Sequence, residues 1–523
     1  MPKNIVVFSD GTGQDGGVRP EQRVSNVYKM YRVCRTGPES AIDPALQVAF
    51  YDPGLGTDIG ATGMSAPVRY VQKMLASVTG RGITTNIADC YEFIINHYQP
   101  GDRIFLIGFS RGAYTVRAVA NLLMLCGVPT RTPTGPLPTF RKAIRDIAEE
   151  AVNEVLEHGA GYPREAFEEE RLEQARRFRN KYGADHTSGE IHRSNAAPYF
   201  IGVFDTVAAL GAVGFRRWAT LSLLLLGLIV GLTLIALPVA APLAGALYLA
   251  GLPFWTTFIS LVAATSVLGV GIAAWRWLTS SKKTIRDFPN KGDVRSHRAE
   301  WKGANFDRLL SRFVSYARSA NAIDETRKDF DRVGWGGPEP GTVPDSSGPE
   351  RLVQLWFAGN HSDIGGSYAE TESRLSDIAL KWMIEEATSI PNPLLVEGQS
   401  RMGDANGIPK LNLFPACDGV QHCEVAGMRD VIESSVPKWL SGLTGKLGWE
   451  VQIRKIHPQA PMHQSVFERF ELSSVTQCAG SGPYRPAALA CHERFAHYYG
   501  TAAGVQVDER LAMVPDKPQH HVP

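Results

Sequence analysis

Short apolar runs that end at glycine, aspartate or asparagine recur along the chain. The run at 4–9 (NIVVFS) stops at Asp10-Gly11, and the run at 103–108 (RIFLIG) is followed by Phe109 and Ser110. Runs of this length between turn residues are typical of buried strands. Strands are thus expected at 4–9, 46–51, 103–108, 198–204 and 351–358, with helices at 82–98 and 111–126. This alternation predicts an α/β fold with a mostly parallel sheet covered by helices on both faces.

Residues 139–182 interrupt the alternation. They contain two highly charged, helix-favouring stretches, FRKAIRDIAEEAVNEVL and REAFEEERLEQARRFRNKYG. Our interpretation is a helical insertion exposed to solvent. A cap over an active site is the alternative.

The longest apolar stretch runs from Trp218 to Trp275, 58 residues without a charged side chain. A helix needs about 20 apolar residues to cross a bilayer core, so the stretch has room for two transmembrane spans. We place the spans near 219–240 and 254–275, with the turn region marked by Pro238, Pro242 and Pro253. The alternatives are a buried helical pair in a soluble protein and a patch that enters one leaflet.

Basic residues flank both ends of this stretch. Arg216 and Arg217 precede it, and Arg276, Lys282 and Lys283 follow it. Both positive ends would then lie on the same side of a membrane, which the positive-inside rule places in the cytoplasm. The sequence therefore predicts a hairpin in the inner (cytoplasmic) membrane, with the rest of the protein cytoplasmic.

Composition excludes several classes of function. Lys plus Arg number 54 and Asp plus Glu 53, a balance that argues against a nucleic-acid partner. The seven cysteines show no CxxC spacing, so we expect free or buried thiols rather than a disulfide framework or a zinc site. No G-x-G-x-x-G or GK[ST] motif occurs, and we expect no cofactor.

Gly108-Phe109-Ser110-Arg111-Gly112 matches the G-x-S-x-G nucleophile elbow. In this motif a serine occupies a sharp turn between a strand and a helix, and glycines leave room for the turn. The pattern places a strand before Ser110 and a helix after it, whose first N–H groups point at developing negative charge. Ser110 is therefore the predicted nucleophile of a serine hydrolase of the α/β-hydrolase class.

A serine nucleophile needs a base and a carboxylate that orients the base, in the chain order Ser, Asp or Glu, His. Asp205 ends a predicted strand (IGVFDTV), and His361 lies in a glycine-rich loop after another (GNHSDIGG). Such loops at strand carboxyl ends carry the catalytic groups of α/β sheets. We predict Asp205 as the acid and His361 as the base, with His463 as the alternative base.

An oxyanion hole needs two aligned donors. The backbone N–H of Arg111 is one, and the other is expected from the loop after the first strand, at Gly11 or Thr12. Asp10 and Asp363 are expected to support these loops by accepting hydrogen bonds. No ligand spacing predicts a metal site.

Several segments together resemble one family. They are FSDGTG at 8–13, YDPGLGT at 51–57, YQPGDRIFLIGFSRGAYTVRAVANLL at 98–123, FIGVFDTVAALG at 200–211, ANAIDETRKDF at 320–330, LWFAGNHSDIGGSY at 355–368, HQSVFERF at 463–470 and YRPAAL at 484–489. The chain resembles the DUF2235 α/β-hydrolase family, which includes the Tle1-type phospholipase effectors of type VI secretion. One departure is Ser319, where many members carry a histidine.

The resemblance implies an α/β-hydrolase core with Ser110, Asp205 and His361 as the triad. It also implies hydrolysis of carboxylic esters, with phospholipid acyl esters as one substrate type. With the hairpin added, the leading hypothesis is a membrane-anchored serine esterase or lipase that acts through an acyl-enzyme on a lipid or other acyl ester. The alternatives are a type VI-like antibacterial lipase effector and a non-catalytic membrane scaffold on a hydrolase fold.

These inferences divide the chain into five parts. They are the N-terminal half of the hydrolase core with the elbow (1–138), the charged helical insertion or cap (139–190), a core strand with the acid loop (191–214), the transmembrane hairpin (215–280), and the C-terminal half of the core with the catalytic histidine (281–523).

Overall fold

Six strands form one central sheet in which every neighbouring pair is parallel. The computed structural model describes residues 2–11, 14, 16, 23–38, 40–54, 81–138, 141–207, 214–301, 309–338, 348–397, 411–425, 451–478 and 480–499. In sheet order the strands are β12 (Leu352–Phe357), β10 (Tyr316–Ala322), β6 (Pro198–Phe204), β3 (Arg103–Phe109), β1 (Asn4–Ser9) and β2 (Gln47–Asp52). The predicted α/β class is confirmed.

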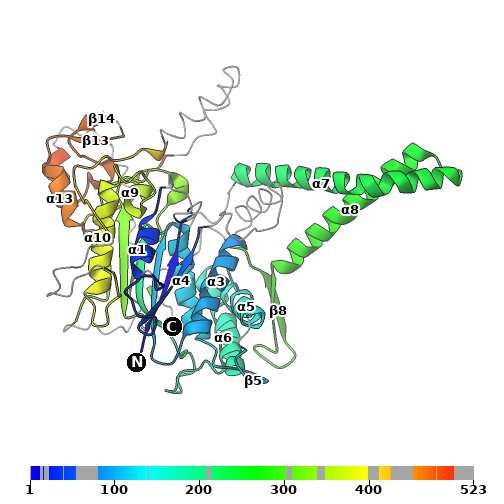
Figure 1. The fold of residues 1–523 in the computed structure, drawn as a ribbon, viewed down its shortest axis with the longest axis horizontal. Coiled ribbons are helices and arrows are strands. Elements are labelled where there is room, and N and C mark those ends of the chain that lie inside the picture. Colours follow the sequence, from blue (N-terminus) through cyan, green and yellow to red (C-terminus); the bar gives the residue numbers. More distant parts are fainter. Residues whose placement is uncertain are drawn as a thin grey trace.

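Helices cover both faces of this sheet (Figure 1). α3 (Arg81–His97) and α4 (Arg111–Cys126) pack on one face, and α1 (Asn26–Cys34) and α10 (Arg374–Thr388) on the other. Successive strand residues alternate between the two resulting cores. Val7 and Leu106 belong to the α3/α4 core, whereas Phe8 and Ile107 belong to the α1/α10 core. Burial on both faces explains why these strands are continuous apolar runs.

The carboxyl ends of these parallel strands meet at one edge of the sheet. β1 ends just before Asp10, β3 just before Ser110 and β6 just before Asp205. Chain segments far apart in sequence therefore deliver their polar end residues to the same edge, which is where α/β folds place ligands.

β10 (Tyr316–Ala322) is a strand that the apolar pattern does not predict. Its sequence YARSANA holds mostly small and polar residues, yet it lies between β6 and β12 and is almost wholly buried. Arg318 is buried in it, where it pairs with Glu386 and donates to the carbonyl of Ala317 at 2.9 Å. Tertiary partners, which no local pattern reveals, hold this strand in the sheet.

The charged insertion adds a helical layer outside α3 and α4. It comprises α5 (Arg141–Glu150), the π-helix η1 (Ala151–Leu156) and α6 (Glu168–Tyr182). Its apolar residues, among them Val152 and Phe178, join the same core as α3 and α4. Its charged side keeps local ion pairs, such as Glu173 with Arg177 at 2.7 Å. The insertion is thus amphipathic, with one side in the core and one in solvent.

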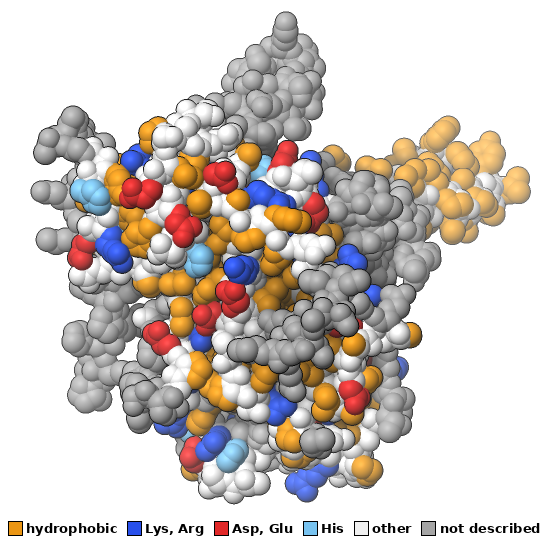
Figure 2. All heavy atoms as spheres, turned by 60° about the vertical axis from the view of Figure 1, so that its left-hand side comes forward, with side chains coloured by type: hydrophobic (Ala, Val, Ile, Leu, Met, Phe, Trp, Pro, Cys, Tyr) orange, Lys and Arg blue, Asp and Glu red, His pale blue; other side chains and the backbone are white. Residues whose placement is uncertain are grey.

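Two long apolar helices, α7 (Gly214–Leu249) and α8 (Phe254–Ser280), project from the body (Figure 1). Hydrophobic side chains cover their outer surface (Figure 2). The segments Leu224–Leu249 and Phe254–Trp275 have mean hydropathies of 2.6 and 2.0, and 11% and 0% of their residues are buried. By length and composition both are able to cross a membrane. α8 leads directly into the hairpin of β7 (Lys282–Arg286) and β8 (Val294–Arg298).

The turn of this pair differs from the prediction. Pro238 and Pro242 were expected in the turn but lie inside α7, so the first helix reaches Leu249. Apolar helices tolerate internal proline because neighbouring groups and local adjustments satisfy the freed carbonyls. Only Pro253 lies between the two helices.

A third apolar cluster stands at the β12 edge of the sheet. It is formed by α13 (Gln464–Glu471), the short strands β13 (Val475–Gln477) and β14 (Gly480–Gly482), and residues near the end of the described chain. Phe470 and Tyr484 are fully buried in it.

The cysteine prediction is wrong at one pair. Cys423 and Cys478 form a disulfide, with Cα atoms 5.2 Å apart. They are 55 residues apart in sequence, so only the fold brings them together and no local spacing marks them. The other five cysteines are free thiols, of which Cys34, Cys90 and Cys126 are buried.

Candidate active site

Ser110 occupies the turn between β3 and α4 in a strained backbone conformation. Its φ is 59° and its ψ is −123°, a region that residues with a side chain rarely adopt. The Ser110 N–H donates to the carbonyl of Phe204 at 3.1 Å, and Tyr114 N–H donates to the Ser110 carbonyl at 3.3 Å. A strained backbone conformation that neighbouring contacts hold in place is typical of functional sites.

The glycines on either side of Ser110 are required by close packing. A Cβ on Gly108 would lie 2.6 Å from the Gly112 carbonyl oxygen. A Cβ on Gly112 would lie 2.1 Å from the carbonyl oxygen of Ser9, at the end of β1. The elbow therefore sits directly against the loop that follows β1.

Asp205 and His361 are in direct contact. Asp205 directly follows β6, has a φ of 39° and is fully buried. One carboxylate oxygen, Oδ2, lies 2.6 Å from His361 Nδ1. The other, Oδ1, accepts from the Ala322 N–H at 3.0 Å. The acid and base predicted from the sequence are thus joined, and the bond fixes the orientation of the imidazole.

Arg454 also binds Asp205, with both terminal nitrogens of its guanidinium. Nη1 lies 2.5 Å from Oδ1 and Nη2 lies 2.9 Å from Oδ2. Burial alone would raise the pKa of Asp205, but the charge of Arg454 and the bond from His361 outweigh it and hold that pKa well below 3.8. Asp205 therefore stays ionised in a buried position, as the acid of a Ser-His-Asp arrangement must.

His361 begins the short helix α9 (His361–Gly365) and is only 3% exposed. Its backbone N–H donates to Glu325 Oε2 at 3.2 Å. Its ring packs against Phe109, the residue before Ser110, with ring centroids 4.7 Å apart, and against Phe330 at 5.1 Å. With Nδ1 engaged by Asp205, Nε2 is buried and has no hydrogen-bond partner.

His361 and Ser110 are neighbours without a hydrogen bond between them. Because His361 Nε2 has no partner, its hydrogen bond to the Ser110 hydroxyl is not formed in this structure. The Phe109–His361 ring contact nonetheless places the imidazole beside the elbow. Catalytic hydrogen bonds are often long before substrate binds and tighten in the substrate complex.

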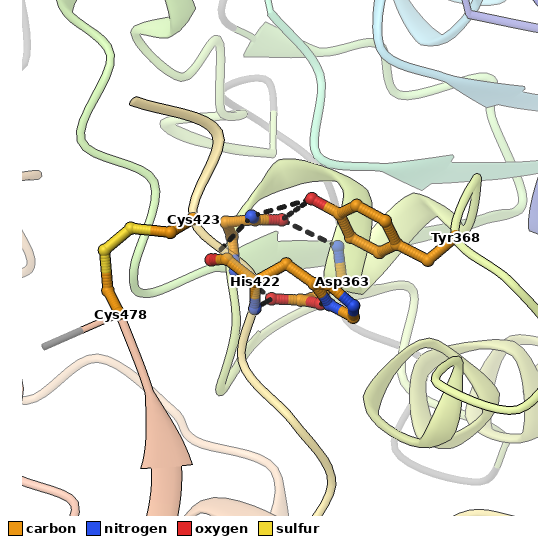
Figure 3. Close-up of a disulfide and its surroundings, with 6 residues drawn as sticks. Asp363, Tyr368, His422, Cys423 and Cys478 are labelled. Carbon is orange, nitrogen blue, oxygen red and sulfur yellow. Dashed lines mark hydrogen bonds and ion pairs between the residues drawn. A yellow bond between two sulfur atoms is a disulfide. The ribbon is translucent and has the colours of Figure 1, made fainter. Parts of the chain in front are cut away.

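Asp363 secures the turn from which His361 projects. Asn360 caps α9 by accepting from the Asp363 N–H at 2.9 Å, and Asp363 in turn accepts from the Asn360 N–H at 3.0 Å. His422 Nδ1 lies 2.7 Å from the other Asp363 oxygen (Figure 3). The neighbouring residue Cys423 is tied to Cys478. The disulfide and the His422–Asp363 pair thus brace the loop that carries His361.

Gly11, the predicted oxyanion donor, lies next to Ser110. A Cβ added to Gly11 would stand 3.4 Å from the Ser110 Cβ. Its N–H, however, donates to Asp10 Oδ1 at 2.7 Å. Arg111 is the first residue of α4, and the N–H groups of a first helical turn have no partner within the helix. Thr12 lies outside the described residues.

Asp10 is a buried hub beneath this loop. Besides the Gly11 N–H, it accepts from the hydroxyls of Tyr51 at 2.7 Å and Ser25 at 2.5 Å. Burial raises the pKa of Asp10 to about 6, although these hydrogen bonds oppose the rise. Asp10 fastens the loop after β1 to α1 and β2.

His463 and Ser319 lie in structural settings. His463 caps α13, where its Nδ1 accepts from the Ser465 N–H at 3.2 Å and its ring stacks on Phe357 at 4.6 Å. Burial lowers the pKa of His463 to about 4. Ser319 is buried within β10 and donates to Asn321 at 2.9 Å. The carboxylate of Asp205 is bonded by His361 and not by His463.

A pocket of about 140 Å³ lies beside the Asp205–His361 pair. Its walls include Glu325, Asn360 and Arg454, which touch or flank the Asp205–His361 pair, together with the Cys423–Cys478 disulfide. Ser110 and His361 are not part of its lining.

A family model described as the T6SS phospholipase effector Tle1-like catalytic domain matches residues 3–225 and 265–386. The chain belongs to this Tle1-like family. The matched residues include Ser110, Asp205 and His361, and they omit 226–264, the greater part of the α7/α8 pair. The family description names phospholipases, so the class of activity it indicates is that of a lipase or esterase.

Two further similarities concern uncharacterized proteins. A protein of Saccharomyces cerevisiae is 25% identical over 428 residues, which cover 74% of this chain and 57% of that protein. The Tle1-like chain thus spans little more than half the length of this relative. A crystal structure of a Pseudomonas aeruginosa protein matches with 15% identity and a TM-score of 0.30, over 76% of this chain and 46% of that one, too low to carry an argument.

Two contributors to the site of this Tle1-like protein were missed by the sequence reasoning. Arg454 lies in the segment WEVQIRKIHP, which carries no motif and falls beyond the last matched residue, 386. Glu325 lies within the segment ANAIDETRKDF, so that resemblance marked its neighbourhood without marking its contact with His361.

Gly112→Ala is expected to destabilise the fold, because its methyl group would meet the Ser9 carbonyl. Overpacking of this kind costs about 1–3 kcal/mol. Thermal unfolding in detergent micelles measures it as a lower melting temperature. Gly37→Ala is the matched control, since no heavy atom lies within 4 Å of the position its Cβ would take. Equal melting temperatures for the two variants would contradict the packing described for the elbow.

Arg454→Met is expected to destabilise the protein by about 3–5 kcal/mol at neutral pH, because it leaves the buried Asp205 charge without its main partner. Asp205 has a depressed folded pKa, so the stability it contributes is present above 3.8 and is lost as the pH falls through the folded value. The difference between wild type and variant should therefore shrink in acid.

The double variant Asp205→Asn/Arg454→Met serves as the control for this pair. It should be less destabilised than the sum of the two single variants, because neither partner is left charged and alone. Unfolding followed across a pH series measures both effects, and additive, pH-independent losses would argue against the ion pair.

Proposed function

We propose that this protein is a membrane-anchored serine hydrolase that cleaves carboxylic esters of lipids, with phospholipid acyl esters as the leading substrate class. Ser110 is the nucleophile, His361 the general base and Asp205 the acid that orients it. The observation that carries the proposal is the 2.6 Å bond from Asp205 to His361 Nδ1, which leaves Nε2 unengaged beside the strained elbow. Membership of a phospholipase family supports it independently.

The first half of the reaction forms an acyl-enzyme. His361 Nε2 takes the proton of the Ser110 hydroxyl as its oxygen attacks the ester carbonyl carbon. The imidazolium that results is stabilised by Asp205, whose own charge Arg454 holds in place. The tetrahedral intermediate then collapses, and the alcohol leaves with the proton from His361.

The second half releases the acid. Water gives its proton to His361 as it attacks the acyl carbonyl, and the proton returns to Ser110 when the intermediate breaks down. In both halves the oxyanion is held by the N–H of Arg111 at the start of α4 and by the loop after β1. For Gly11 this requires exchange of its present bond to Asp10. The Thr12 N–H is the alternative donor.

The apolar hairpin supplies the membrane attachment. Its greater part, residues 226–264, is absent from the family match, so we take the middle of the 215–280 segment as an addition to the family's catalytic core. Its outer face is almost entirely apolar and unburied. Arg216 and Arg217 lie in the first turn of α7, and Lys282 and Lys283 follow α8. We place it in the cytoplasmic membrane with the catalytic core on the cytoplasmic side.

The family description names effectors, which act outside the cell that makes them. An effector role would require the unburied apolar surface of α7 and α8 to be shielded during export. A resident membrane enzyme needs no such step, and the hairpin therefore favours it.

Wild-type protein in detergent micelles is expected to react with a fluorophosphonate probe and to release fatty acid from phospholipid vesicles. Ser110→Ala and His361→Ala should each lower both signals by at least about 1,000-fold, because the triad acts as a unit. His463→Ala is the matched histidine control and should keep activity near that of wild type.

Each contrary outcome has a distinct meaning. Labelling that needs His463 but not His361 would transfer the role of base to His463. Folded wild-type protein that neither labels nor hydrolyses any ester would indicate a non-catalytic scaffold. Labelling without release of fatty acid from lipid would keep the serine hydrolase and exclude phospholipids as its substrate.

Replacing residues 219–275 by a short glycine–serine linker is expected to move the protein from the membrane fraction to the soluble fraction. Sedimentation of cell lysates, with and without alkaline carbonate washing, measures this. Short-chain ester hydrolysis should persist in the deletion variant, whereas hydrolysis of vesicle lipid should fall. Wild type that is washed off by carbonate would contradict a spanning hairpin.

A further inference from the structure

A second cluster of ionisable side chains lies far from the elbow in the chain, where the charged insertion meets the β7–β8 hairpin. His158 follows η1, Glu170 is in the first turn of α6, and His297 is on β8. Neither the proposed reaction nor the sequence motifs involve these three residues. They join two chain segments separated by the whole apolar hairpin.

The three side chains converge closely. His158 Nε2 lies 2.8 Å from Glu170 Oε2, and the ring centroids of His158 and His297 are 4.5 Å apart. One ligand atom from each residue lies within 4.8 Å of the others. His158 and Glu170 are only 2% and 7% exposed. These three atoms are close enough together to hold one metal ion, provided that the ion replaces the hydrogen bond between His158 and Glu170.

Both imidazoles are neutral near pH 7. Burial lowers the pKa of His158 below 6.5, and burial together with the neighbouring His158 lowers the pKa of His297 to about 4. A neutral imidazole has a lone pair on one ring nitrogen and a proton on the other. His297 Nε2 accepts from the Gly159 N–H at 2.9 Å, and His297 Nδ1 is buried without a hydrogen-bond partner, so an ion bound at Nδ1 would replace the proton there.

The charges around the cluster are locally compensated. Lys283 is bonded to Glu157 at 2.7 Å. Arg295 lies 3.3 Å from Glu170 Oε1, so it occupies one oxygen and leaves the other, Oε2, facing His158. A dication would therefore meet one carboxylate oxygen and two neutral rings.

We propose that His158, Glu170 and His297 bind one divalent transition-metal ion, with Zn²⁺ the ion that suits them best. Two imidazole nitrogens and one carboxylate oxygen are ligands that Zn²⁺ accepts, and a water molecule would complete four-coordination. The ion would act as a clip that fixes the hairpin following α8 to the insertion packed on α3 and α4. It would thereby anchor the base of the apolar helices to the catalytic core.

The test is Zn²⁺ binding by the full-length protein in detergent micelles after treatment with EDTA. The parent protein for this test carries His520→Ala and His521→Ala, which removes a competing histidine pair near the chain end. Every other variant is made in this parent. Equilibrium dialysis with elemental analysis should find one tightly bound Zn²⁺ per chain. Bound Co²⁺ should give the intense visible bands of a four-coordinate site.

His297→Phe and Glu170→Gln should each weaken Zn²⁺ binding by about 100-fold or more, since loss of an outer-shell partner alone costs 10–100-fold. Phenylalanine preserves the stacking on Phe167, where the ring centroids are 3.9 Å apart, and glutamine is isosteric. His192→Ala is the matched control on an exposed histidine of the same segment and should bind like the parent.

Two further readouts decide the proposal. Zn²⁺ should raise the melting temperature of the parent and of His192→Ala but not of the two ligand variants. If His297→Phe fails to fold, Glu170→Gln alone carries the comparison. No stoichiometric Zn²⁺ in the folded parent, or binding that survives in Glu170→Gln and His297→Phe, would overturn the site. Ester hydrolysis is not needed for any of these measurements, so they are independent of the proposed reaction.

Discussion

The buried negative charge of Asp205 is the constraint on which the site depends. An isolated carboxylate in this position would be neutralised by protonation, because burial strongly disfavours its charged form. Arg454 and His361 together prevent this, and each comes from a different part of the chain. The ionised state of Asp205 is therefore not a property of β6 alone. It exists only when the segment near residue 454 has packed across the carboxyl end of the sheet.

The same edge explains why the surrounding loops are so tightly packed. Gly108 and Gly112 allow the elbow to lie against the end of β1, and Asp10 fastens the loop beside it. Asp363, His422 and the Cys423–Cys478 bond hold the turn that begins at His361. Ser110 and His361 thus lie on two turns at the same sheet edge, and each turn is held by its own set of contacts.

Much of this architecture could be predicted, and the exceptions share one cause. Strands β1, β3, β6 and β12 are apolar runs with turn residues at their ends, and such local patterns identify them. β10 could not be found this way, because its buried Arg318 is stable only through Glu386 in α10.

The candidate site likewise has residues that local patterns predict and residues that they do not. Ser110 stands in a motif, and strand ends pointed to Asp205 and His361. Arg454 and the Cys423–Cys478 pair act through partners distant in sequence, which a single sequence does not disclose. The internal prolines of α7 were misplaced for a different reason, since proline rules drawn from water-soluble helices do not apply to an apolar one.

The position of the apolar hairpin in the chain has a consequence for biosynthesis. α7 and α8 lie between β6 and β10, so the ribosome completes Asp205 before the hairpin and His361 and Arg454 after it. The emerging chain then holds Ser110 and Asp205 but neither partner of the Asp205 carboxylate. The contacts around Asp205 can be completed only after the hairpin has been made and the chain has returned to the sheet. The order of synthesis thus delays the stabilisation of this buried charge until both apolar helices have left the ribosome.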